Sequence, residues 1–496
     1  MHIREASHSP ALDRAARACV LAGLVVFAAF VVWLERMPAG FDSIRGLNPL
    51  AAAEWRARFG AGDASIPEPL YRAGVQVLQV VSWVLYGLLL ALVYRGARFS
   101  AAWTWRLAVP VLLAVAVAMP AALSADAFAY VGYARLAVVH GLNPHLHTQA
   151  ELVKLGDPTG PYLHWPIASP YGPLWTLVCM AIVAAGRLFS TDGIWGVVLA
   201  LKLLGAAGVL GMAALLRALV RRGDDPERAE AAFVLMLVNP VSLCEGPGNG
   251  HNDVVMMALA LAGLVAWLTP MSGRASGQSS GRAHPLLAAV WLGVAAAVKL
   301  IPLLLLPWVA LSALRSGNGA RRWGRATAIV CLGFAPVVLA YAPFWSGGRA
   351  LGGLAERFRS ADQPDQTDLA PGPPRADPDA SGTATSPTTD GPPPRQAIRR
   401  SGGPLVHLVR RTWLTALVYA GATLILWRGG APLLALTGWA YLSSAVMLFV
   451  AGLWFPWYLT WTWPAVLARA NRHHQVLTLF LFLFSLLLMM VYATPP

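Results

Sequence analysis

CVLAGLVVFAAFVVWLE, residues 19–35, is an apolar run preceded by Arg14 and Arg17. Wound into a helix, a run of this length is long enough to cross the hydrocarbon core of a bilayer. No small-residue cleavage site follows it, and further apolar runs do, which argues against a signal peptide. The run therefore predicts a membrane helix whose N-terminus lies in the cytoplasm.

Similar runs recur along the whole chain. The 496 residues are 57% hydrophobic and only 12% charged, with a mean hydropathy of +0.55. Soluble domains carry about 25% charged residues, so the composition excludes an ordinary soluble protein. We predict an all-α integral membrane protein with 11–13 helices, because the 285–312 run is either one kinked helix or a pair. The expected helices lie near 18–36, 73–95, 103–122, 171–188, 193–217, 228–244, 252–269, 285–312, 325–344, 403–427, 431–452, 455–468 and 475–492.

The net charge of +14 comes from arginines gathered in short loops. This is the pattern of the positive-inside rule and not of a nucleic-acid-binding protein. It places 95–102 and 221–228 in the cytoplasm and the loops 123–170 and 346–402 outside. Two apolar runs separate 123–170 from 221–228, although an odd number of crossings is required. Either one run is re-entrant or interfacial, or one loop breaks the charge rule.

The chain divides into three parts. Residues 1–345 form the expected transmembrane catalytic module with its outside loop 123–170, and 403–496 form the C-terminal membrane helices. Between them, 346–402 form a second outside loop. Its segment 361–395 holds nine prolines and no aromatic residue. Such a segment cannot bury enough surface to offset its ordering entropy, so we expect it to be disordered.

A first polar cluster begins where an apolar run ends, in LSADAFAYVGYARLAVVHGLNPHLH, residues 123–147. Ser124 and Asp126 are suited to cap an amphipathic helix over about 127–140, which would lie at an interface. Capping leaves the rest of the loop without an explanation, and ordered loops of this length are usually functional. The candidate substrate-binding residues of this loop are Tyr130, Arg135, His145 and, in the returning SPYGPLW stretch (169–175), Tyr171.

A second cluster, NPVSLCEGPGNGHNDVV (239–255), holds Glu245, Asn249, His251, Asn252 and Asp253 between two apolar runs. It is either a capped turn or a group of side chains facing a cavity, since five such groups are costly in lipid. We take His251, Asn252 and Asp253 as candidate substrate-binding residues.

Two further features stand inside apolar stretches. Lys299 either extends its ammonium to an interface or meets an anion in the membrane, for which a phosphate is the obvious candidate. LWFPWYLTWTWP (453–464) is either an aromatic belt at headgroup level or a platform for sugars, and we take Trp457 and Tyr458 as candidate sugar contacts.

No phosphate-binding glycine loop, dinucleotide fingerprint or metal-ligand set is present, so we expect no resident cofactor; a need for a divalent metal stays open. A polyprenyl-phosphate sugar accounts for all four features, because it brings its own anionic leaving group. Transfer of the sugar from such a donor to a hydroxyl of an acceptor molecule needs one carboxylate as the base that removes the hydroxyl proton. Lys299 and Arg135 are suited to bind the phosphate of the donor.

The motifs SADAFAYVGYARLAVVHGLNPH, SPYGPLW, GNGHNDVVMMALALAG and VKLIPLLLLP together resemble bacterial GT-C-type glycosyltransferases. They are most similar to the polyprenyl-phosphomannose-dependent α-1,6-mannosyltransferases. The resemblance implies a GT-C-like helix bundle with a large extracytoplasmic loop that carries interfacial helices. It transfers the base role to Asp126, in Ser124-Ala125-Asp126. The family's second acid has no clear counterpart, since residue 127 is alanine; Asp157 and Asp253 are the substitutes.

The resulting prediction is a multi-pass enzyme of the bacterial inner membrane with its active site on the extracytoplasmic face. It moves a hexose, for which mannose is the first choice, from a polyprenyl phosphate to a glycan or lipid acceptor, with inversion. The alternative is a secondary transporter or flippase that uses the same polar groups as a path. A transporter should show repeated halves, and the sequence shows no internal repeat.

Overall fold

The computed structural model describes most of the chain, with gaps. The described residues are 9–36, 66–121, 123–124, 126–159, 167–188, 194–221, 226–268, 284–316, 319–353, 416–424, 438–439, 442–443, 456–468 and 472–493. The regular elements within these ranges are helices, beside an isolated bridge between Ser346 and Gly348. The protein is an all-α membrane protein, as predicted. The segment 361–395 and most of the expected helices 403–427 and 431–452 lie outside the described residues.

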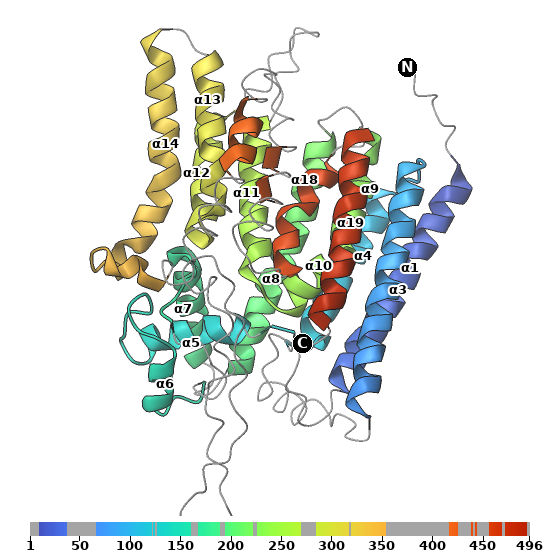
Figure 1. Ribbon diagram of the computed structural model, residues 1–496, viewed down its shortest axis with the longest axis horizontal. Coiled ribbons are helices and arrows are strands. Elements are labelled where there is room, and N and C mark those ends of the chain that lie inside the picture. Colours follow the sequence, from blue (N-terminus) through green and yellow to red (C-terminus); the bar gives the residue numbers. More distant parts are fainter. Residues whose placement is uncertain are drawn as a thin grey trace, which may run out of the picture.

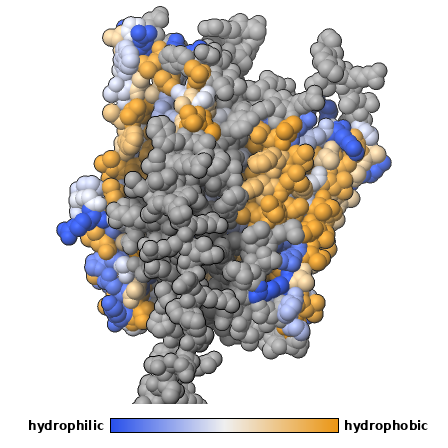
Figure 2. Space-filling view, in the orientation of Figure 1, coloured by the Kyte–Doolittle hydropathy of each residue, from blue (hydrophilic) through white to orange (hydrophobic). Residues whose placement is uncertain are grey.

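Five helices in the described part of the chain are long and apolar enough to cross a membrane. They are α1 (Pro10–Glu35), α3 (Glu68–Tyr94), α4 (Ala101–Ala118), α8 (Ile194–Arg221) and α14 (Ala320–Tyr341). The α1–α3 pair forms one flank of the bundle and α14 the other (Figure 1). Hydrophobic surface covers both flanks in Figure 2. Val25, Val84 and Leu339 on these helices are more than half exposed, which suits contact with hydrocarbon.

Prolines break two of the expected spans. The 285–312 run is a pair of helices, α12 (Pro285–Val298) and α13 (Leu306–Ser316), joined by a 3-10 turn at Ile301–Leu305. The expected single helix 455–468 is wrong. A 3-10 segment, Pro456–Trp461, precedes the five-residue helix α18 (Trp463–Leu467). Pro464 has no N–H to bond a preceding turn, and it lies in the first turn of α18, where that N–H is not needed. Two further helices of the described part of the chain are α11 (Asn252–Leu268) and α19 (Arg472–Ala493).

The course of α7 (Pro173–Arg187) decides between the topological alternatives. Its 15 residues span only about 22 Å, less than the roughly 30 Å of a hydrocarbon core. The N–H of Gly172 donates to Val298 O (3.1 Å) at the end of α12, and Arg187 donates to Val138 O (3.3 Å). The helix therefore runs from the C-terminal end of α12 to the C-terminal end of α5 (Asp126–Val138) without crossing the bundle (Figure 1).

This course of α7 is compatible with both predictions from charge, which place the loop 123–170 outside and the loop 221–228 in the cytoplasm. Arg98 forms an ion pair with Glu227, so the loop after α3 and the turn before α9 (Ala229–Leu237) lie at one end of the bundle. Phe128 and Trp195 pack with ring centroids 5.7 Å apart, which places the start of α8 beside α5 at the other end. The run that does not cross is thus 171–188, and the two loop assignments need no exception to the charge rule.

The expected helix 228–244 bends by 54° between α9 (Ala229–Leu237) and the following segment. Asn239 causes the break, since its side-chain oxygen accepts from Val241 N (3.0 Å) and Ser242 N (3.3 Å) and caps α10 (Pro240–Leu243). A π-helical turn, Cys244–Gly248, continues α10. It passes so close to α8 that a Cβ on Gly205 would lie 2.3 Å from Gly246 O. This close packing of Gly246 on Gly205 holds the polar turn 245–253 at the end of the bundle where α5 lies.

Candidate active site

Asp126 opens α5 (Asp126–Val138) at the polar end of the bundle. Ser124 caps it as expected, because its hydroxyl accepts a hydrogen bond from Asp126 N (3.2 Å). The expected amphipathic pattern of this helix is wrong: its residues from Asp126 to Leu136 are all buried, and it packs against α7 and α8. Burial on every side gives the Asp126 carboxylate a fixed position in a site largely closed to solvent.

The imidazole of His251 lies between two carboxylates. Its Nδ1 is 3.3 Å from Asp126 Oδ2, and its Nε2 is 3.2 Å from Glu245 Oε2. Asn249 Nδ2 donates to the same Glu245 oxygen (3.1 Å). Burial alone lowers the pKa of His251, but Asp126 and Glu245 outweigh it and raise that pKa above its usual range. The first and second polar clusters are therefore one cluster, although about 120 residues separate them.

Tyr130 joins Asp126 to the start of α11. Its hydroxyl is 3.5 Å from Asp126 Oδ2 and 3.3 Å from Asn252 Oδ1, so its single proton can go to either. The rings of Tyr171 and Trp175 stand edge-on to the Tyr130 ring, with centroids 4.6 and 5.2 Å away. These contacts fix the phenol beside the carboxylate.

Lys299, the residue after α12, turns its ammonium inward. Its Nζ donates to Asp253 Oδ1 (2.8 Å), and Trp461 Nε1 donates to the same oxygen (2.6 Å). The ammonium also lies over the rings of Tyr458 (4.7 Å) and Trp461 (5.1 Å). Of the two interpretations left open, contact with an anion inside the protein is the one that the structure shows. The anion present is a carboxylate. The side chain of Lys299 keeps 24% of its surface exposed, so a ligand can reach it.

Two candidate residues lie elsewhere. The Nε of Arg135 donates to both oxygens of Asp157 (2.9 and 3.1 Å), which also contacts His140 (2.8 Å). Burial raises the pKa of Asp157, but these hydrogen bonds and those from Thr159 outweigh it and lower that pKa to about 2. His145 packs against the ring of Phe344 (4.9 Å), and burial lowers its pKa to about 4.

The structure thus brings together eight of the candidate residues and leaves their roles as predictions. The gathered residues are Asp126, Tyr130, Tyr171, His251, Asn252, Asp253, Lys299 and Tyr458. The side chain of Trp457 lies outside the described part of the chain. Within the described residues, no group of three or more His, Cys, Asp or Glu side chains is placed to hold a metal ion.

Sequence reasoning overlooked two buried groups of this region. Trp461 belongs to the aromatic stretch, and its contacts with Asp253 and Lys299 distinguish it from the other rings there. Lys202 donates to Met119 O at the end of α4. The sequence could have indicated Lys202, because it is a lone cation in the apolar stretch LALKLLG (199–205).

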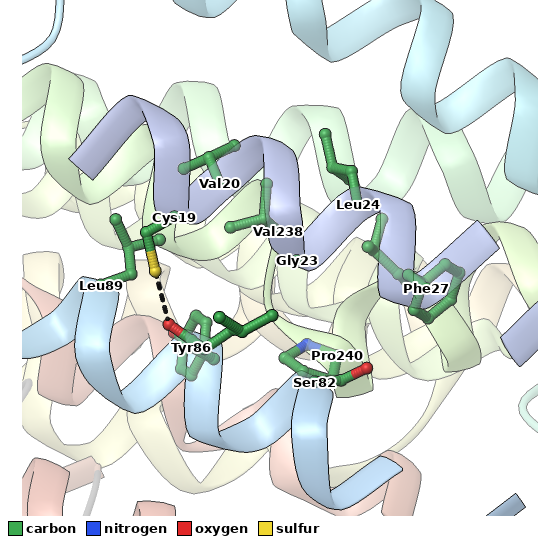
Figure 3. Close-up of a pocket in the computed structure, with 12 residues that line it drawn as sticks. Cys19, Val20, Gly23, Leu24, Phe27, Ser82, Tyr86, Leu89, Val238 and Pro240 are labelled. Carbon is green, nitrogen blue, oxygen red and sulfur yellow. Dashed lines mark hydrogen bonds between the residues drawn. The ribbon is translucent and has the colours of Figure 1, made fainter. Parts of the chain in front are cut away.

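An apolar pocket lies apart from this cluster, between α1, α3 and the break before α10 (Figure 3). It exists because Gly23 leaves a notch between Cys19 and Phe27, one turn away on either side; nothing lies within 4 Å of the position of a Cβ there. The Cys19 thiol donates to Leu85 O (3.0 Å). None of the gathered candidate residues lines this pocket, so it offers no acid–base chemistry to the site.

Comparison with known proteins adds a family. Residues 26–315, more than half of the chain, match the family described as alpha-(1->6)-mannopyranosyltransferase, N-terminal domain. Alpha-(1->6)-mannopyranosyltransferase B of Corynebacterium glutamicum is 32% identical over 104 residues, which are 21% of this chain and 16% of that protein. No solved structure matches the chain. The family match includes all of the gathered residues except Tyr458. The chain belongs to the alpha-(1->6)-mannopyranosyltransferase family.

Proposed function

We propose that this protein is a membrane mannosyltransferase that moves mannose from a polyprenyl phosphate to a hydroxyl of a glycan or glycolipid. The observation that carries the proposal is the gathering of a carboxylate, Asp126, and a cation, Lys299, around one polar turn. Such a pair is what transfer from a sugar phosphate needs: a base for the acceptor and a positive charge for the leaving group.

The proposed reaction is a direct displacement. Asp126 takes the proton of the acceptor hydroxyl as its oxygen bonds to C1 of the mannose. The bond from C1 to the phosphate oxygen breaks. The polyprenyl phosphate leaves, and its oxygen keeps the electron pair of that bond. Lys299 stabilises the negative charge that develops on this phosphate oxygen, while its ammonium also donates to Asp253. A single displacement inverts the configuration at C1.

The arginines support an active site on the extracytoplasmic side. Arg95 and Arg221 end α3 and α8, and Arg315 lies in the last turn of α13, all at the end opposite α5 (Figure 1). The positive-inside rule puts that end in the cytoplasm. The polar cluster then lies near the extracytoplasmic face, where a sugar carried by lipid is available and a nucleotide sugar is not. Family membership favours this enzyme over the transporter or flippase alternative.

Donor choice tests the proposal. Purified protein with an oligomannoside acceptor is supplied with radiolabelled polyprenyl-phosphate mannose, glucose, galactose or arabinose, and separately with GDP-mannose in the absence of polyprenyl phosphate. We expect labelled product from the lipid-linked mannose and none from GDP-mannose alone. Robust transfer from GDP-mannose alone would show that the donor is not lipid-linked.

A further inference from the structure

Glu245 is a buried carboxylate that the proposed reaction does not use. It lies on the π-helical turn Cys244–Gly248, and only 3% of its side chain is exposed. π-Helical turns of this kind often occur at functional sites. Because Asn249 fixes one Glu245 oxygen, the carboxylate is held against the ring of His251, on the side away from Asp126.

We propose that Glu245 is a positioning residue: acting through His251, it keeps Asp126 ionised and aimed at the acceptor hydroxyl. This inference rests on the proposed role of Asp126 as the base.

The first argument is the number of protons on the ring. A neutral imidazole has one N–H, so it can donate to only one of two flanking carboxylates; the imidazolium has two and can donate to both. The carboxylates lie 3.3 and 3.2 Å from the two ring nitrogens. The arrangement therefore suits a protonated ring that bridges Asp126 and Glu245.

The second argument is charge. His251 is completely buried, and an isolated cation there would be costly. Two carboxylates compensate it, and the group of three keeps one net negative charge, available to the acceptor proton. Without Glu245, the ring would lose its proton more readily and would then have one N–H to orient, with nothing to fix it on Asp126.

The other ionisable groups around His251 are already engaged. Asp253 on α11 pairs with Lys299, and Tyr130 on α5 contacts Asp126 and Asn252. Lys202, the charged group on α8 near this turn, bonds Met119 O. Glu245 and Asp126 are the two carboxylates in direct contact with the ring, so changing Glu245 should change the charge of His251 more than changing any residue outside the reaction itself.

The test is the pH dependence of kcat/KM with the lipid-linked mannose donor. Glu245→Gln removes the charge but keeps the shape. An opposite charge at this distance shifts a pKa by roughly 1–3 units, so we expect the alkaline limb of the profile to move to lower pH by about one unit or more. Glu245→Asp keeps the charge and should retain a limb near that of the wild type. It also provides a reading if the glutamine variant does not fold.

Glu151→Gln is the matched control, because Glu151 also contacts a histidine, His147 (2.9 Å), but away from Asp126. Its profile should superimpose on that of the wild type. A Glu245→Gln profile that is lower at every pH with unmoved limbs, or unchanged, would overturn the positioning role. Absence of transfer by the wild-type protein would instead count against the proposed function itself.

Discussion

Replacement of Asp126 by asparagine is expected to lower kcat for mannose transfer by about 10²–10⁴-fold, the usual contribution of a general base. Asparagine keeps the size of the side chain and its hydrogen bond to Tyr130, but it cannot take the acceptor's proton. Initial rates of purified variant, measured with saturating lipid donor, give the effect.

The fold must be shown to survive this change. Asp126 contacts His251, so the variant should be checked for a single monodisperse species and a melting temperature near that of the wild type. Glu151→Gln, a carboxylate change in the same loop without contact to the cluster, should keep full activity. An asparagine variant with near-native turnover would mean that Asp126 serves only to begin α5.

The second large effect is expected from Lys299→Met. Hydrogen bonds to charged groups contribute about 1.5–3 kcal/mol, so loss of the phosphate contact should raise the KM for the lipid donor roughly 10- to 100-fold. The change in kcat should be smaller. The measurement is a donor titration with purified variant at fixed acceptor concentration.

A structural role of Lys299 must be separated from this binding role. Removing the ammonium leaves Asp253 buried with Trp461 as its remaining donor, and breaking a buried ion pair from one side is strongly destabilising. The double variant Lys299→Met, Asp253→Asn removes both charges. We expect it to restore stability but not the donor KM, while Lys299→Arg keeps a low KM. A wild-type KM in the double variant would show that Lys299 only neutralises Asp253.

Much of the architecture could be predicted because it depends on local properties. The length and composition of the apolar runs predict α1, α3 and α8, and the arginines at the ends of these helices predict their direction. The course of α7 could not be predicted in this way. Its apolar composition does not differ from that of a crossing helix, and its non-crossing course depends on the contact of Gly172 with the end of α12.

The site shows the same division. That Asp126 and His251 meet was predictable, since both lie in loops on the same side of the membrane. The position of Arg135 was predictable too, and was missed. It follows Asp126 by about two and a half helical turns and so points to the opposite side of α5, whereas Tyr130, one turn on, shares the face of Asp126.

The partner of Lys299 was beyond the sequence. A lone cation in an apolar run signals that an anion is nearby but does not say which one. The sequence suggested Asp253 as a cap, a second acid or a substrate contact, and its contact with Lys299 arises from the packing of α11 against α12.

The most direct measurement is a cryo-electron microscopy structure of the protein with a non-transferable polyprenyl-phosphonate mannose. The proposed function places the phosphonate against Lys299 and the anomeric carbon of the mannose facing Asp126. The polyprenyl chain should extend sideways from the protein into the bilayer. A phosphonate bound at the arginine-rich end of the bundle, or in the pocket beside Cys19, would contradict it.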